Sequence, residues 1–192
     1  MLAVPGRGPE KQDCLSARVQ CRFPDALVVH RLDMATSGLI CLARGGANQR
    51  QLSRAFAERA VCKRYVARVI GRLPAGDGAA DGWQLIDLPL GADWPNRPQR
   101  KVDHAAGKPS QTRWRFAGYD AAQDTTRVDL EPITGRTHQL RVHLAALGHP
   151  IVGDTLYAPP SSVSRMQLHA TALCLPHPAD GRMLEFASPP PF

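Results

Sequence analysis

The carboxylate of Asp33 stands between two apolar segments, where an unpaired charge is costly. Residues 26–30 (ALVVH) and 39–43 (LICLA) are typical of buried strands, and the turn-like stretch 31–38 (RLDMATSG) joins them. A carboxylate this near a core needs hydrogen bonds or a cation. Two interpretations stay open: an Asx-type turn, in which Asp33 accepts from the amides of Thr36 and Ser37 and which the local pattern favours, or a catalytic carboxylate.

Two arginines and a tyrosine are the next candidates for chemistry. The stretch 134–143 (TGRTHQLRVH) resembles a helix start that binds phosphate, where Arg136 and unbonded backbone amides could meet an anion. The alternative is ordinary salt bridging by Arg136 and Arg141 on a solvated helix face. Tyr65 lies in an alternating segment whose other face is cationic, and a core tyrosine is the commoner explanation for such a residue.

Metal, redox and nucleotide-binding motifs find no support in the sequence. It contains no P-loop, no G-x-G-x-x-G and no H-E-x-x-H. His138 and His143 are five residues apart, on different sides of a helix, so we expect no metal site. No two cysteines form a C-x-x-C pair, and we expect most to be small buried hydrophobes. The five are Cys14, Cys21, Cys41, Cys62 and Cys174.

The basic residues are unevenly placed along the chain. Lysine and arginine number 24 against 17 acidic residues, a net charge of +7. The segment 44–72 holds eight basic residues and one acid, and the segment 94–115 holds six and one. Concentrated arginine suggests a polyanion partner, RNA or DNA. The alternative is that these arginines decorate solvated faces.

The length fits one domain, or two lobes that share one core, and we expect a single catalytic domain over residues 1–192. No stretch approaches the roughly 20 apolar residues that cross a bilayer. The N-terminus lacks the apolar core and cleavage site of an export signal, so we expect a cytoplasmic protein. No apolar self-association helix stands out, and we therefore expect a monomer.

Hydrophobic periodicity predicts an α+β fold. Strands are expected at 26–30, 39–43, 61–73, 112–119, 126–131 and 166–175, and helices at 14–21, at 45–59 and from residue 138 to Leu147. The helix 45–59 is expected to place Leu52, Ala55 and Phe56 on one face and Arg50 and Arg54 on another. We interpret 74–82 as a loop tip, 91–111 as a projecting loop or irregular hairpin, and the Pro-rich end as a tail. Because strands connect mostly through turns, the sheet is expected to be mixed and mostly antiparallel, flanked by helices and loops.

Three segments together resemble the motif blocks of the RluA-type RNA pseudouridine synthases. They are HRLDMATSG (30–38), KRYVARV (63–69) and ITGRTHQLRVHLAALGHPIVGD (133–154), in that family's order and approximate spacing. The resemblance covers nearly the whole chain and implies the pseudouridine synthase catalytic fold without an S4 domain. The stretches DWPNRPQRK (93–101) and GKPSQT (107–112) resemble the small members that modify 23S rRNA and the tRNA anticodon stem-loop.

The resemblance implies roles for particular residues. Asp33 would be the catalytic carboxylate, with Arg141 as its ion-pair partner, and Tyr65 would stack on the target base and take part in removing its C5 proton. Arg31 would fill the gap left by the flipped nucleotide. No cofactor is implied. Further RNA contacts are expected at Arg50, Arg54, Lys63, Arg64, Arg97, Arg100, Lys101 and Arg136.

Two other functions stay open at this stage. The chain would be a basic RNA-binding or ribosome-associated protein without catalysis, such as a degraded relative, or it would apply the same chemistry to another rRNA or tRNA uridine. Retained, salt-dependent RNA binding without isomerised uridine distinguishes the first of these from an active enzyme.

The chain begins inside a motif that family members normally precede with a further strand. Such a missing strand would leave a sheet edge unpaired and apolar surface exposed. We therefore expect poor solubility or stability of the 192-residue chain, measured by thermal unfolding. A reversible, cooperative transition in the range of ordinary mesophilic domains would contradict this.

Overall fold

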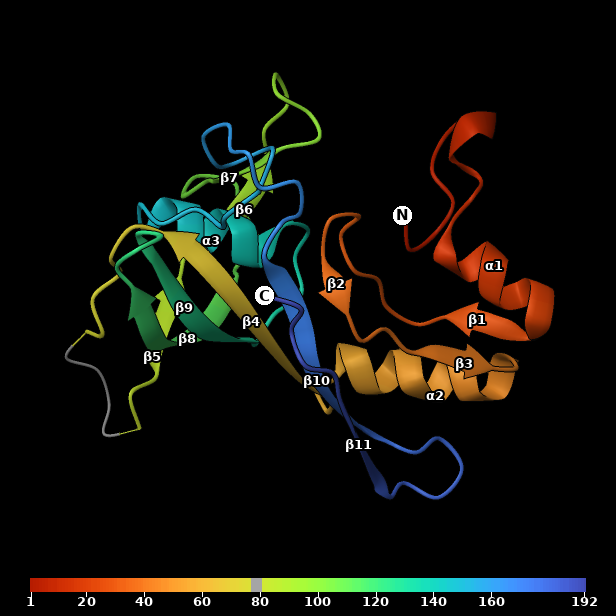
Figure 1. The fold of residues 1–192 in the computed structure, drawn as a ribbon. Helices are drawn as coiled ribbons and strands as arrows, with labels where there is room; N and C mark the ends of the chain where they lie inside the picture. The colour runs from red at the N-terminus through yellow and green to blue at the C-terminus, as the bar shows by residue number, and fades with distance from the viewer. Residues whose placement is uncertain (77–80) are drawn as a thin grey trace. The chain divides into compact units, whose positions relative to one another are not determined.

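The computed structural model describes residues 1–76 and 81–192, which form two compact units (Figure 1). Unit 1 comprises Met1–Lys63 and Ala170–Pro189, and unit 2 comprises Arg64–His169 and Pro190–Phe192. The chain passes from one unit to the other within β4 (Cys62–Ile70) and again within β10 (Leu168–Pro176). Much of the predicted tip 74–82 lies outside the described residues.

Unit 1 is built from short elements around a small apolar core. They are η1 (Pro9–Lys11), α1 (Leu15–Arg22), β1 (Ala26–Val28), β2 (Ser37–Gly38), β3 (Leu42–Arg44), α2 (Gly46–Ala57) and β11 (Met183–Ala187). β1 pairs antiparallel with β3, while β10 pairs with β2 and antiparallel with β11. Helix α2 buries Leu52 and Ala55 and leaves Arg50 and Arg54 exposed, which confirms the predicted faces.

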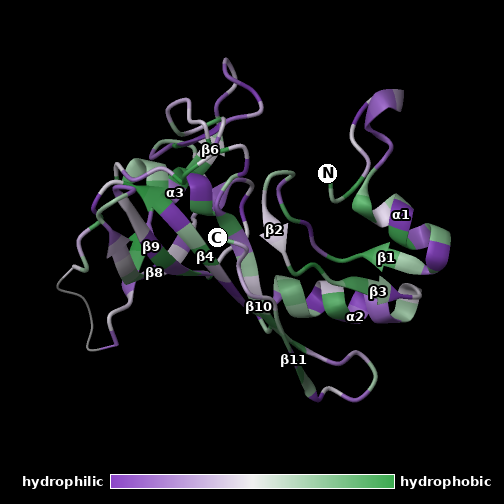
Figure 2. Cartoon of the chain, in the orientation of Figure 1, coloured by the Kyte–Doolittle hydropathy of each residue, from purple (hydrophilic) through white to green (hydrophobic). Residues whose placement is uncertain are grey.

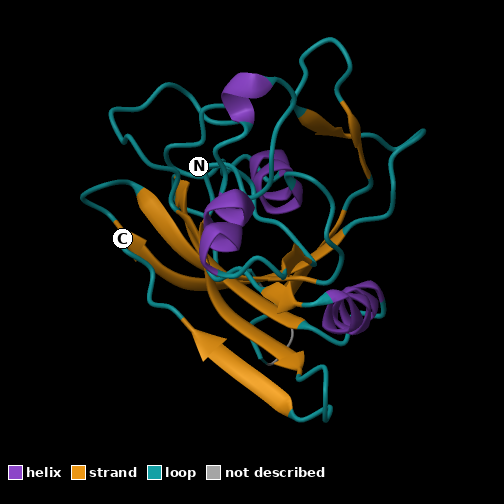
Figure 3. Ribbon diagram, turned by 90° about the vertical axis from the view of Figure 1, so that its right-hand side faces the viewer, coloured by secondary structure: helices purple, strands orange, loops and turns teal. Residues whose placement is uncertain are grey.

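Unit 2 contains an antiparallel sheet in the order β4, β9, β8, β5. Besides β4, the elements of this unit are β5 (Gln84–Asp87), β6 (Leu90–Ala92), β7 (Arg100–Val102), β8 (Gln111–Asp120), β9 (Thr125–Pro132) and α3 (Gln139–Ala146). Long loops join several of the elements (Figure 3). The core of the unit includes Ala67, Val128 and Leu130 from the sheet and Leu140 and Leu144 from α3. Burial of this apolar face is what holds α3 in place, because an eight-residue helix is marginal in isolation.

The segment 91–111 contains the predicted hairpin. β6 and β7 pair antiparallel, with Leu90 opposite Val102 and Ala92 opposite Arg100. Figure 2 shows β1 in the colours of hydrophobic residues and the loop between β6 and β7 mostly in those of hydrophilic ones. The hairpin therefore presents a polar tip on a base that is anchored by the buried Leu90.

Several expectations from the sequence are wrong. Only Cys14 of the five cysteines is fully buried, because Cys21 lies on the exposed side of α1 and Cys62 starts β4 at the surface. The helix predicted to reach Leu147 ends at Ala146, and Leu147 is 37% exposed. The chain end carries β11, whose mostly exposed side chains show no alternation because backbone pairing to β10 holds it.

The α+β class and the mostly antiparallel pairing are confirmed. A single catalytic domain over 1–192 stays a prediction. Among the described residues, no helix combines the length and hydropathy of a membrane span. Over the same ranges, no three histidine, cysteine or acidic side chains gather as a metal site would need.

Candidate active site

Asp33 sits in a tight turn of unit 1 between β1 and β2. The amide of Thr36 donates to the backbone carbonyl of Asp33 (N···O 3.0 Å), which closes a turn over residues 33–36. Asp33 is half-buried, and Arg31 and Met34 beside it are exposed. The backbone thus closes the turn, and both the Asx-type turn and the catalytic carboxylate stay open as roles of the Asp33 side chain.

His30 anchors the start of the same loop. Its Nε2 accepts a hydrogen bond from the amide of Cys41 (2.9 Å), and its ring stacks on Phe56 of α2 with centroids 4.5 Å apart. Burial, together with the nearby charge of Lys63, lowers the pKa of His30 to about 4. The ring is thus neutral at neutral pH, as an Nε2 acceptor must be.

Gly38 ends the loop at a point where no side chain fits. Its φ is +104°, which residues with a Cβ rarely adopt, and an added Cβ would overlap the backbone of Ala170 in β10. The following residue, Leu39, donates its amide to the carbonyl of Ala170 (3.0 Å). The loop that carries Asp33 is therefore held at one end by His30 and at the other by close backbone contact.

Tyr65 lies on β4 at a register position opposite Leu130 of β9. It packs against the core of unit 2 but keeps partial exposure. The alternation predicted for this strand holds only in part: Ala67 and Val69 are buried and Arg64 is exposed, but Val66 is buried as well. This position is compatible with a core tyrosine and with a ring that offers one face to a base.

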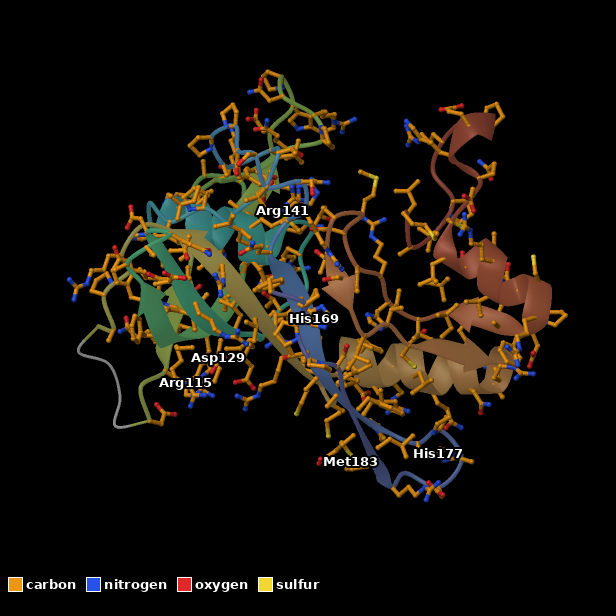
Figure 4. The ribbon with its side chains drawn as sticks, viewed as in Figure 1. Arg115, Asp129, Arg141, His169, His177 and Met183 are labelled. Carbon is orange, nitrogen blue, oxygen red and sulfur yellow. The ribbon has the colours of Figure 1, made fainter. Side chains whose placement is uncertain are left out.

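Arg141 is buried on α3 and forms a bidentate ion pair with Asp154 (Figure 4 labels Arg141). Nε donates to Oδ2 and Nη2 donates to Oδ1, both at 2.7 Å, and the two side chains are 5% and 0% exposed. Parallel charge-assisted bonds of this kind fix the plane of the guanidinium. The solvated helix face considered from the sequence is wrong for Arg141, because α3 buries this side.

Tyr157 links this ion pair to the hairpin. Its ring centroid lies 5.1 Å from the Arg141 guanidinium carbon, and its hydroxyl accepts from the Arg100 amide of β7 at 2.7 Å. The same hydroxyl lies 2.7 Å from Nδ1 of His138. Asp154 also accepts from the amides of Leu156 and Tyr157, which shapes the segment 154–157 around the arginine.

The turn before α3 is closed by its own side chains rather than left open for an anion. The buried Gln139 accepts from the Arg136 amide (2.9 Å) and from the Thr134 hydroxyl (2.7 Å). Its Nε2 donates to the Gln111 carbonyl and to the Thr112 hydroxyl. The amide of Arg136 is thus already bonded within the turn, while a contact of the exposed Arg136 side chain with a phosphate stays a prediction.

Comparisons with known proteins address the family directly. The family model described as "RNA pseudouridylate synthase" matches residues 20–146, about two thirds of the chain. The chain belongs to this family.

Bacterial relatives match over almost the full length. Proteins named dual-specificity RNA pseudouridine synthase RluA are similar: that of Yersinia pestis is 51% identical over 97% of this chain and 88% of its own, and that of Escherichia coli K12 is 50% identical over 100% and 86%. This pseudouridine synthase thus spans most of the length of these relatives.

A solved structure supports the same fold. Human RNA pseudouridylate synthase domain containing 1 is 35% identical, covering 93% of this chain and 75% of its own, with a TM-score of 0.77. Human RNA pseudouridylate synthase domain containing 4, at 22% identity and a TM-score of 0.70, shares the fold. The pseudouridine synthase fold expected from the motif blocks is confirmed.

The three predicted catalytic residues are divided between the two units. Asp33 belongs to unit 1, whereas Tyr65 and Arg141 belong to unit 2, and their meeting in one site stays a prediction. The sequence reasoning gave no role to His30, Asp154 or Tyr157. The signal available for Asp154 was an acid at the end of an apolar stretch (PIVGD), which needs a buried cation.

The predicted RNA contacts differ in their surroundings, and all stay predictions. Arg54 forms an ion pair with Glu58, and Nη2 of Arg64 lies 3.8 Å from Oε2 of Glu131. Lys63 is half-buried, and its pKa is lowered by desolvation and by the charge of Arg59. The remaining positions are Arg31, Arg50, Arg97, Lys101 and Arg136, which are exposed, and Arg100, which is half-buried.

Replacing Asp154 by alanine is expected to lower the free energy of unfolding by about 3–5 kcal/mol, because it leaves the buried Arg141 charge without its partner. Urea unfolding measures this. Asp25→Ala is the matched control, since it breaks an exposed Arg44–Asp25 pair of the same 2.7 Å length and should cost less than about 1 kcal/mol. Equal losses in the two variants would contradict the importance of the buried pair.

His30 predicts an acid-dependent loss of stability. Its folded-state pKa of about 4 lies below the ordinary 6.5, so the unfolded chain binds more protons between these values. The contribution of His30 to the free energy of unfolding is therefore complete above pH 6.5. It falls by up to about 3 kcal/mol as the pH drops to about 4. His30→Gln keeps an acceptor but cannot titrate, so the difference in unfolding free energy between the two proteins should change across this window. A difference that is constant with pH would refute this role.

Proposed function

We propose that this pseudouridine synthase isomerises specific uridines in 23S rRNA and in the tRNA anticodon stem-loop, in the cytoplasm, with Asp33 as the catalytic carboxylate. The observation that carries the proposal is the support built around the motif residues. Asp33 lies in a loop clamped by His30 and Gly38, and Arg141 is oriented by a buried acid. Such rigid support is what a reacting carboxylate and its cation need.

The chemistry requires only a carboxylate, a cation and a base. The N1–C1′ bond of the uridine breaks, the base turns over, and C5 joins C1′. The proton leaves C5 and N1 ends protonated, so atoms and electrons balance without a redox partner. Asp33 either attacks C1′ or removes the 2′ proton to form a glycal-like species, and both routes need the ionised carboxylate.

Arg141 would favour that ionised form. A cation beside a carboxylate stabilises its charge, and the bidentate pair with Asp154 engages Nε and Nη2 in a fixed plane. We propose, as the resemblance of the motif blocks implies, that Arg141 is the ion-pair partner of Asp33. Arginine suits this double duty because it presents five donors in a rigid fork.

Tyr65 and Arg31 would handle the base itself. A uridine inside an RNA stack must be extruded before its C1′ can react, at a cost of a few kcal/mol. Tyr65, half-exposed over the core, would stack on the extruded ring and take part in removing the C5 proton. The exposed Arg31, two residues before Asp33, would occupy the vacated place in the stack.

The relatives support the choice of two RNA classes. Their names call them dual-specificity enzymes, and they are 51% and 50% identical over 97% and 100% of this chain. The net charge of +7 suits a polyanionic substrate. We propose that the active form is a monomer.

Tritium release from [5-³H]uridine tests this function. The wild-type chain should release tritium from an anticodon stem-loop and from a 23S rRNA fragment, and Asp33→Ala should fall to background while its RNA affinity stays within a few-fold. Asp25→Ala, which removes an exposed carboxylate of the same unit, is the control and should keep activity.

Each contrary result points to a specific error. Activity in Asp33→Ala would remove this residue from catalysis. Tight, salt-dependent binding of both RNAs by the wild-type chain with no release would favour the non-catalytic RNA-binding function. Release from only one RNA class would refute dual specificity.

A further inference from the structure

An exposed tryptophan stands at the tip of the hairpin of unit 2. Trp94 is 67% exposed, whereas the other two tryptophans, Trp83 and Trp114, are buried. The guanidinium carbon of Arg97 lies 3.7 Å from the centroid of the Trp94 ring. One face of the ring is thus covered by a cation, and at this exposure the opposite face is open to solvent.

The tip that carries this ring is built by its own hydrogen bonds. The amide of Asp93 donates to the Gln99 carbonyl (3.2 Å), and the amide of Gln99 donates to the Asn96 carbonyl (2.9 Å). The side chain of Asn96 donates to the Asp93 carboxylate (3.0 Å). The loop is therefore ordered, and holding the exposed ring there costs little further conformational entropy on binding.

The surroundings of the ring are positively charged. Arg97, Arg100, Lys101 and Lys108 lie along the hairpin and the strand segment beside it. The acids of this region are used internally: Asp93 accepts from Asn96, and Asp103 accepts from the amides of residues 105 and 106. A flat apolar ring among cations matches a flat base on a phosphate backbone better than it matches a protein surface.

We propose that the open face of Trp94 is a stacking platform for an unpaired base of the RNA substrate, with Arg97 holding the ring from behind. This rests on the proposed function and adds a positioning residue to it. The base is a nucleotide other than the target uridine, read through its π-face rather than its hydrogen-bonding edge. Trp94 therefore contributes affinity and placement but not chemistry.

A nucleotide held at Trp94 has a defined relation to Arg141. The backbone of the hairpin is tied to the Tyr157 hydroxyl through the amide of Arg100, and the Tyr157 ring packs against the Arg141 guanidinium. All of these residues belong to unit 2. Stacking at the tip thus fixes the RNA relative to the arginine proposed to meet the catalytic carboxylate.

Intrinsic fluorescence tests the contact directly. Because Trp94 is the exposed one of three tryptophans, a base stacked on it should quench the emission of the wild-type chain when a stem-loop RNA is titrated in. Trp94→Phe should lose most of this quenching while retaining affinity within a few-fold, since phenylalanine also stacks. Quenching that persists in Trp94→Phe would overturn the proposal.

Affinity and kinetics give a second, independent readout. Trp94→Ala should weaken binding of the anticodon stem-loop by roughly 5- to 150-fold, the effect of removing one stacked aromatic ring. KM should rise by a similar factor, and kcat at saturation should stay within a few-fold. Phe186→Ala, which truncates an exposed aromatic side chain of β11 in unit 1, is the matched control and should bind as the wild type does.

Abasic substitution identifies the partner base. Each loop nucleotide of the stem-loop is replaced in turn by an abasic analogue, and each RNA is bound to the wild type and to Trp94→Ala. At one position, removal of the base should weaken RNA binding by the wild type but not by Trp94→Ala. Such non-additivity is the signature of direct coupling between that base and Trp94.

Three results would overturn the platform. They are unchanged RNA affinity in Trp94→Ala, equal losses at every abasic position, and a loss of binding to phosphatidylglycerol vesicles without any loss of RNA binding. The last would assign the ring to an anionic membrane surface. Because the binding and fluorescence readouts do not require turnover, an inactive chain would refute the proposed function while leaving this test decisive.

Discussion

The buried ion pair between Arg141 and Asp154 is the interaction on which the architecture of unit 2 depends. Two charges removed from water are tolerated only when their hydrogen-bonding capacity is filled. Asp154 meets this condition by accepting from the guanidinium twice and from two backbone amides. The pair therefore joins α3 to the segment 154–157, and Tyr157 extends the same network to the hairpin through the amide of Arg100. One electrostatic requirement thus places Arg141, α3 and the hairpin of β6 and β7.

Unit 1 holds a carboxylate, that of Asp33, in a short loop without the support of a large core. His30 stays neutral and stacks on Phe56, so it closes the loop at one end by accepting a single amide. Gly38 closes the other end because its missing Cβ lets the chain approach β10. Arg31 and Asp33 lie between two fixed points. The loop thus has a defined path even though few of its residues are buried.

Much of this was accessible from the amino-acid pattern. The helix 45–59 was predicted from the spacing of Leu52 and Ala55, and the strand pair at 112–131 from alternation and an intervening turn. The strand β11 escaped prediction because an edge strand held by backbone bonds leaves no periodic trace. The bond between the Arg136 amide and the Gln139 side chain is not visible in the sequence, because only the folded turn brings the two groups together.

The sequence by itself determined the family and most of the elements, because motif blocks and hydrophobic periods are local properties of the chain. It could not determine which partner each charged or polar group would find. Arg141 and Asp154 are 13 residues apart, and Arg100 and Tyr157 are 57 residues apart. Long-range pairing follows from burial, since only in the folded protein does the cost of an unpaired charge select its neighbour.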